Sequence, residues 1–213
     1  MPLILNPYAF AAFSFAFQAS ADSSAQTITC PTVEPYDVGV LFDTATNSTA
    51  SIPSNVVPSG FAQLQTSSTT YYRTTLSYKV FDGTEDGASF TGMNGNHSNA
   101  KVLLVFRPTR AIATVGTSTF LQETSSGAPA SQLIAASGQT APLIRLAACV
   151  DGAGPSSANF TGGTFDATVV KTGSDSSIRA GYAVQNTSPS NTTVSMADGG
   201  AGNCLISGWM NFT

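Results

Sequence analysis

Short runs in which every second residue is apolar follow one another along most of the chain. Val38, Val40 and Phe42 show this period, and so does YYRTTLSYKVF at 71–81. A period of two predicts β-strands that bury one face and leave the other toward solvent. Such strands pair as an antiparallel sheet over a core. The same period recurs at 144–150, 165–169, 178–184 and 204–212.

One run is apolar on both faces. KVLLVF at 101–106 predicts a central strand that is covered on both sides. Turn-rich stretches such as DGTEDG and NTSPSNTT separate the runs, no window has a helical period, and no internal repeat is visible. Many short strands with this spacing predict an all-β fold, namely an antiparallel, jelly-roll-like β-sandwich.

The first 24 residues, MPLILNPYAFAAFSFAFQASADSS, carry no charged side chain before Asp22. No Lys or Arg precedes the apolar run, so we do not expect a cleaved secretory leader. Asn6 and Pro7 interrupt it, and a membrane helix needs about 20 consecutive apolar residues, so we expect no membrane span. Phe13 and Phe17 belong to a period-two pattern instead, which predicts a strand with one buried face.

We predict that residues 1–24 form an apolar N-terminal arm or anchor and that residues 25–213 form the β-sandwich domain. Each buried Phe contributes about 1.5–3 kcal/mol, so such an arm suits docking on its own domain or on a neighbouring subunit. An ordinary first strand of the domain is the alternative. The residues predicted to dock are Tyr8, Phe10, Phe13, Phe15 and Phe17.

Composition narrows the range of partners. Charged residues make up only 9% of the chain and the formal net charge is −4, so no basic stripe is expected and nucleic-acid binding has little electrostatic support. Cys30, Cys149 and Cys204 are odd in number and far apart. We therefore predict reduced, buried thiols rather than a zinc site or a disulfide framework, as in a protein folded in a cytosol.

Four segments are familiar together: TITCPTVEPYDVGVLFDTAT, VVPSGFAQLQTS, RTTLSYKVFDGTEDGASFTG and NAKVLLVFR. They resemble a β-sandwich module of tail-fibre and other virion surface proteins of tailed bacteriophages, over roughly residues 26–185. LNPYAF at the start also resembles the first residues of several phage structural proteins. The family carries its module inside longer fibres, whereas here it stands nearly alone. The resemblance implies a fold and a place on a virion, and leaves the individual role open.

Few residues suit catalysis or metal binding. His97 is the only histidine and stands in the loop sequence NGNHSN, so we expect a solvated loop residue or a subunit contact and no catalytic residue. DGTEDG at 82–87 has the spacing of the first half of a calcium loop, but Met93 stands where the terminal Glu would fall. A hairpin turn explains the stretch without metal. We predict no cofactor, and calcium at this loop stays open.

Several Asn-X-Ser/Thr sequons occur in the chain. They would be glycan acceptors in a secreted eukaryotic protein, but they arise easily by chance in a sequence so rich in Ser, Thr and Asn. We expect solvated turns without glycans. The sequons are at Asn47, Asn96, Asn159, Asn186, Asn191 and Asn211.

Three aromatic residues, Tyr71, Tyr72 and Trp209, are candidates for contact with a receptor or glycan. Trp209 falls on the strand face opposite to Cys204 and Ile206. That position also suits a subunit interface, and core packing is the alternative for all three rings.

These features together predict a non-enzymatic structural protein of a phage virion, assembled in the host cytoplasm. We expect a fibre or a tail or collar accessory protein involved in attachment, which contacts other virion proteins and forms a homo-oligomer, with a trimer favoured. Host surface polysaccharide is the candidate external partner. A capsid decoration protein is the close alternative, and a secreted glycan-binding glycoprotein is the alternative from another class.

Overall fold

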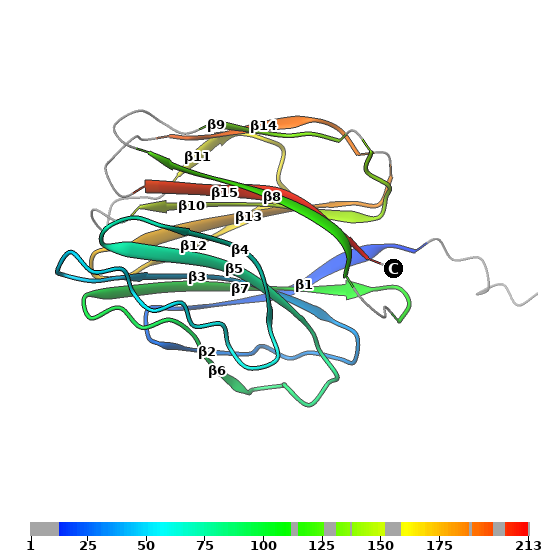
Figure 1. Cartoon of the computed structure of the whole chain (residues 1–213). Helices are drawn as coiled ribbons and strands as arrows, with labels where there is room; N and C mark the ends of the chain where they lie inside the picture. Colours follow the sequence, from blue (N-terminus) through cyan, green and yellow to red (C-terminus); the bar gives the residue numbers. More distant parts are fainter. Residues whose placement is uncertain are drawn as a thin grey trace, which may run out of the picture.

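The computed structural model describes residues 13–111, 115–125, 131–136, 138–151, 159–187, 189–197 and 203–212. All regular structure within these ranges is β-strand, and the strands pair in antiparallel fashion. Two five-stranded sheets pack face to face (Figure 1). The predicted all-β antiparallel sandwich is confirmed, whereas the jelly-roll connectivity stays a prediction.

The first sheet uses only the first half of the chain, in the order β1-β7-β3-β5-β4. Its strands are β1 (Phe15–Ser23), β3 (Val38–Thr46), β4 (Ala62–Ser68), β5 (Tyr72–Val80) and β7 (Ser98–Pro108). A separate two-stranded sheet covers its outer face, formed by β2 (Thr27–Thr29) and β6 (Ser89–Thr91).

The second sheet uses only the second half, in the order β12-β13-β10-β15-β8. Its strands are β8 (Val115–Ser125), β10 (Leu143–Asp151), β12 (Ala167–Thr172), β13 (Ser177–Gln185) and β15 (Asn203–Phe212). A three-stranded sheet covers its outer face, formed by β9 (Ser131–Ile134), β11 (Phe160–Gly162) and β14 (Thr192–Met196).

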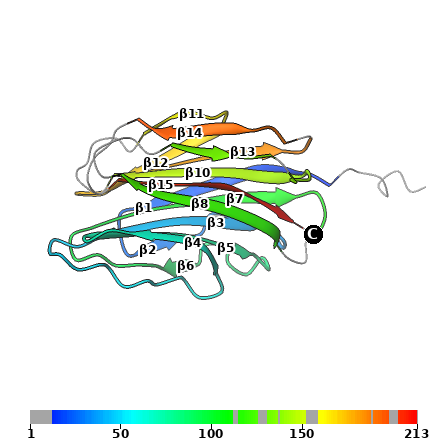
Figure 2. The same cartoon turned by 45° about the horizontal axis from the view of Figure 1, so that its top comes forward.

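The four sheets form four layers with three apolar cores between them (Figures 1 and 2). The central core lies between the two large sheets, and an outer core lies under each small sheet. Both faces of the central strands of the large sheets are therefore buried, which explains why β3 is buried at all nine positions. Strand β7 lies between β1 and β3, and 101–106 is buried throughout, as the apolar run predicted.

The two halves repeat one topology, although the sequence shows no visible repeat. Taken in chain order, the five strands of either large sheet lie side by side as first, fifth, second, fourth and third. The small covering sheets repeat too, since β2 pairs with β6 and β9 pairs with β14. Strand β11 has no counterpart among the described residues of the first half.

Strand register confirms the equivalence at single-residue level. Val40 pairs with Tyr78 and Leu104 in the first half, and Leu146 pairs with Tyr182 and Gly208 in the second. Residues 65–80 and 99–108 therefore align with residues 169–184 and 203–212, at a spacing of 104 positions. Only three of these aligned pairs are identical, which is why the repeat escapes inspection: Tyr78 and Tyr182, Val80 and Val184, Asn99 and Asn203.

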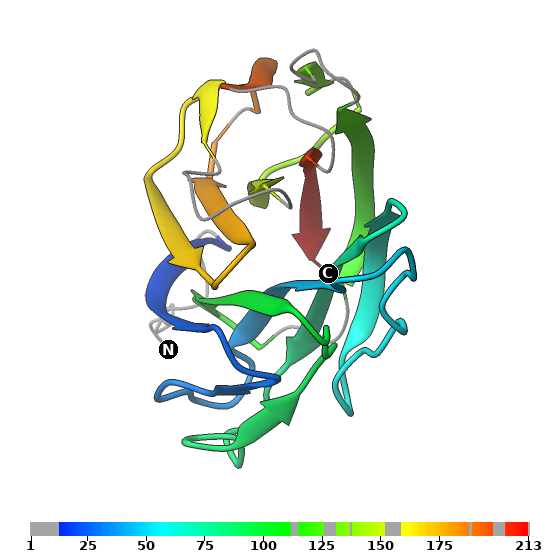
Figure 3. The ribbon, with the colours of Figure 1, turned by 90° about the vertical axis from the view of Figure 1, so that its left-hand side faces the viewer.

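The halves are related by an approximate two-fold axis. Edge strand β4 of the first sheet lies against β8 of the second, and β1 lies against β12 and β13 (Figure 3). Since β8 is the counterpart of β1, and β12 is the counterpart of β4, exchanging the halves turns each of these edge contacts into the other. The sandwich is in this sense an intramolecular dimer of two similar units.

Candidate functional site

The three candidate rings lie in three different environments. Trp209 is only 7% exposed and packs in the second outer core, on the face of β15 opposite to the central core, as its alternation predicted. Tyr72 is buried in the central core. Tyr71 is 52% exposed. The structure therefore does not bring the three rings together on one surface, and only Tyr71 is presented to solvent.

The described phenylalanines of the predicted arm belong to the sandwich. Phe15–Ser23 is edge strand β1, which pairs with β7, so the structure assigns this part of segment 1–24 to the first sheet. Phe15 is buried in the central core, and Phe13 and Phe17 pack against it. Tyr8 and Phe10 lie outside the described residues.

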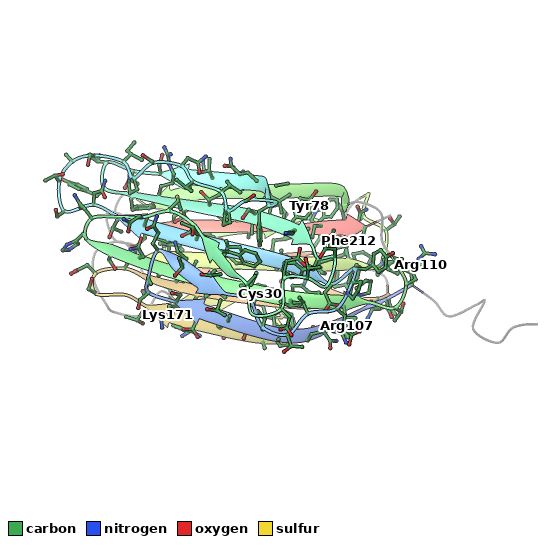
Figure 4. All side chains as sticks on the ribbon, turned by 90° about the horizontal axis from the view of Figure 1, so that it is seen from below. Cys30, Tyr78, Arg107, Arg110, Lys171 and Phe212 are labelled. Carbon is green, nitrogen blue, oxygen red and sulfur yellow. The ribbon has the colours of Figure 1, made fainter. Side chains whose placement is uncertain are left out.

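Contacts with residues of both halves of the chain hold the start of β1 in place. The Phe15 ring lies 4.5 Å from the Phe212 ring, centroid to centroid, and the Arg110 guanidinium lies 4.4 Å from the centre of the Phe13 ring. Arg110 and Phe212 lie at the same end of the sandwich (Figure 4). The Asn186 side chain forms two hydrogen bonds with the Phe15 backbone. Its Oδ1 accepts from the Phe15 N–H, and its Nδ2 donates to the Phe15 carbonyl. The start of β1 thus joins the two halves.

His97 makes a contact between the halves. Its Nε2 lies 2.9 Å from Oδ2 of Asp175, and each of these side chains is 44% exposed. The Ser98 and Ser176 hydroxyls share a hydrogen bond of 2.8 Å just below this pair. Ser174 donates to the His97 carbonyl. The loop that carries His97 therefore holds the turn between β12 and β13 against β7, and these contacts are structural in kind.

The DGTEDG stretch is a closed turn. One carboxylate oxygen of Glu85 accepts from the backbone N–H groups of Asp82 and Gly83, and the other pairs with Lys79 at 2.8 Å. Asp82 accepts from the backbone and hydroxyl of Thr84, and these bonds lower the pKa of Asp82. Over the described part of the chain, no group of three or more His, Cys, Asp or Glu side chains is arranged to hold a metal ion.

A fully buried ion pair under the first small sheet was not found from the sequence. Lys101 Nζ contacts Asp43 and donates to the Met93 carbonyl at 2.9 Å, while the Met93 N–H donates to Asp43 at 2.8 Å. Burial raises the pKa of Asp43 and lowers the pKa of Lys101, and the attraction between the two charges opposes both shifts. A Cβ at Gly92 would lie 2.1 Å from the Asp43 carboxylate, so the glycine closes the site. The sequence indicated the pair only by a charged residue at one end of each of two apolar runs, Asp43 after 38–42 and Lys101 before 102–106.

A hollow of the described surface lies beside Trp209. It has a volume of about 280 Å³ and lies between β8, β9 and β15, with the exposed side chains of Leu121 and Leu133 on its lining. A narrower polar recess adjoins it and is lined by Arg145, Gln139 and Ser190. Ile134, Ala135, Gln139 and Trp209 line both spaces.

Arg145 is buried to 98% in the wall of that recess. It donates to the carbonyl and hydroxyl of Ser190, and no described carboxylate forms an ion pair with it. Burial lowers the pKa of Arg145, with the charge of Asp166 acting in the opposite direction. Sequence reasoning identified Trp209 but missed Arg145, whose apolar neighbours Ile144 and Leu146 gave the only signal of its burial.

No protein-family model, curated protein or solved structure matches this chain. The described residues form no helix that is long and apolar enough to cross a membrane.

Proposed function

We propose that this protein is a non-enzymatic structural protein of a tailed-bacteriophage virion, displayed on the particle surface as a fibre or as a tail or collar accessory protein involved in attachment. The observation that carries the proposal is that charged side chains form ion pairs within the fold. Those with described ion pairs serve the framework: Lys79 with Glu85, His97 with Asp175, Lys101 with Asp43, Arg107 with Glu34 and Asp37, and Lys171 with Asp22.

The layered architecture also supports a scaffold role. The central strands of both large sheets are buried on both faces, so loops, small sheets and edge strands form the outer surface. That surface is rich in hydroxyl and amide groups and carries the exposed ring of Tyr71. Surfaces of this kind bind polymers through many weak contacts repeated over identical subunits, which suits a homo-oligomer, with a trimer favoured, that touches host polysaccharide.

The sequon asparagines weigh against the secreted-glycoprotein alternative. Asn47 donates from Nδ2 to Ser51, and Asn186 donates from Nδ2 to the carbonyl of Phe15. The side-chain oxygen Oδ1 of Asn96 accepts from the Ser48 N–H. Their amide groups therefore stabilise loops and β1 rather than projecting freely. Capsid decoration stays the close alternative.

Locating the chain in an intact particle tests the proposal. Purified virions are expected to contain the protein in a fixed copy number that co-sediments with infectivity, and gold-labelled antibody is expected to mark the tail. Label spread over the head would favour capsid decoration instead. Absence from washed virions, or hexosamine-sized additions to the intact mass, would overturn the proposal.

A further inference from the structure

The hollow beside Trp209 has a counterpart in the first half, and there the space is filled. The rings of Phe81 and Phe90 stack at 6.1 Å, and Phe61 packs on the Phe90 ring at 5.0 Å. Phe81 lies so close to β3 that a Cβ at Gly39 would be 2.4 Å from its ring. Leu103 is fully buried in the same outer core. The first half therefore closes this site with aromatic packing.

The register between the halves shows what replaces these residues. In the second half Gln185 stands at the place of Phe81, Ser207 at the place of Leu103, and Val194 at the place of Phe90. Each replacement removes apolar volume. Trp209, at the place of Val105, returns part of it. Ser207 and Trp209 line the hollow of about 280 Å³, and Gln185 lines the adjoining recess. The hollow is therefore a specific difference between two units of the same topology.

The most unusual exchange places Arg145 where the first half has Gly39. A buried guanidinium is costly unless an anion or several hydrogen-bond acceptors compensate it, and here Ser190 is the described partner. The recess also holds a buried side-chain oxygen of Gln139 without a hydrogen-bond partner. The Arg145 guanidinium is therefore suited to a ligand with acceptor oxygens, whereas the Gln139 oxygen needs a hydrogen-bond donor such as a bridging water.

We propose that the hollow beside Trp209 and the adjoining Arg145 recess together bind a small carboxylate with an apolar body. The apolar part packs between Trp209, Leu121 and Leu133, and the carboxylate accepts hydrogen bonds from Arg145. The volume lies just below the range of about 300–1,000 Å³ usual for ligand pockets, so the ligand is compact. This inference does not depend on the proposed virion role.

Trp209 provides a direct reporter, because it is the only tryptophan of the chain. The full-length protein is titrated with 3-phenylpropionate, with the neutral 3-phenylpropionamide and with glucuronate, while Trp209 fluorescence is recorded. We expect a saturable change with 3-phenylpropionate and affinity at least about tenfold weaker for the amide, which lacks the charge. Equal affinity for acid and amide, binding of glucuronate alone, or no response to any of the three would overturn the proposal.

Variants locate the response. Arg145→Gln is expected to remove the preference for the acid over the amide, and Arg145→Lys to retain part of it. Ser207→Leu restores the residue of the first half on the lining of the hollow and is expected to weaken binding at least about tenfold while keeping the protein folded, as circular dichroism checks. Tyr71→Ala, on an exposed position, is the control and is expected to bind as the wild type does. Undiminished binding in folded Ser207→Leu would also overturn the proposal.

Discussion

Tyr78 and Tyr182 occupy the same place in the two halves of the chain. Each lies on the fourth strand of its sheet and pairs across to the corresponding residue of the second strand, Val40 or Leu146. Both side chains face the central core, and Val80 and Val184, two residues further on, do the same. Identical residues are thus retained where the two units meet.

The equivalence predicts how the buried ion pair responds to substitution. Asp43 pairs with Lys101, and the equivalent pair in the second half is Cys149 with Leu205. Lys101→Leu alone leaves a buried carboxylate and is expected to cost about 3–5 kcal/mol of unfolding free energy in urea denaturation. Asp43→Cys/Lys101→Leu, which copies the second half, is expected to be more stable than the single variant. A double variant no better than the single one would contradict this.

The pH dependence of Lys101→Leu gives a further check on the same pair. Burial holds the pKa of Asp43 above its ordinary value, so without Lys101 the folded state binds this proton more tightly than the unfolded state does. Stability of the variant relative to wild type is therefore expected to improve as pH falls toward the acid range. Urea midpoints measured from pH 7 down to pH 4 test it, and a widening deficit would refute it.

The thiols give a prediction at alkaline pH. All three cysteines are buried and none is in a disulfide, as the sequence predicted. Burial raises the pKa of Cys204 to about 11 from 9.0, so the unfolded chain loses this proton first and stability falls as pH rises from about 9 to 11. Cys204→Ala is expected to reduce that fall by about 2–3 kcal/mol. Buried Tyr72 and Tyr182, whose pKa values are also raised, supply part of the remaining slope.

Reagent access checks the burial of the same thiols. The native protein is expected to react slowly with a thiol-specific dye, and the denatured protein to react at all three cysteines. Rapid labelling of the native protein would show that the cores open easily.

The start of β1 is predicted to be essential for stability. Phe15 is buried, whereas Phe13 is only partly buried, so Phe15→Ala is expected to cost about 3–5 kcal/mol and Phe13→Ala clearly less. Removal of residues 1–24 would uncover the edge of β7 and is expected to give an unstable or aggregating protein. Thermal melts of the three variants test this. A truncated protein as stable as the wild type would show that β1 is dispensable.

Gly39 is predicted to be irreplaceable in the presence of Phe81. A methyl group there would meet the Phe81 ring at 2.4 Å, so Gly39→Ala is expected to cost about 1–3 kcal/mol. Adding Phe81→Leu to Gly39→Ala makes room and is expected to recover part of the loss, which a double-mutant cycle measures. Additive effects of the two changes would contradict the proposed contact.

Much of the fold could be predicted because alternation reports directly on buried strand faces. The run at 101–106 even indicated a strand covered on both sides. Strand order and the repeat could not be predicted, since packing constrains polarity and size at most positions and only a few identities, such as Tyr78 and Tyr182, survive. The sequence placed β1 in an arm outside the domain because alternating Phe residues predict a strand but not the strand with which it pairs, here β7.

The candidate sites were harder for a related reason. A ring such as Tyr72 has the same pattern whether its strand faces a core or a receptor, and burial decides between the two. Arg145 stands inside an apolar run, where one charge carries no sign of the hollow beside it. The exchange of Leu103 for Ser207 at the hollow is visible only when the two halves are aligned residue by residue.

The separation of strand pairing into two halves has a consequence for synthesis on the ribosome. Each described strand pair joins two strands of the same half, so the first large sheet and its cover can form before the second half has emerged. Until then the inner face of that sheet, including Val40, Phe42 and Leu104, has nothing to pack against. The nascent chain therefore passes through a stage with a large exposed apolar face, at which chaperones would act and at which two unfinished chains could pair with each other in place of their own second halves.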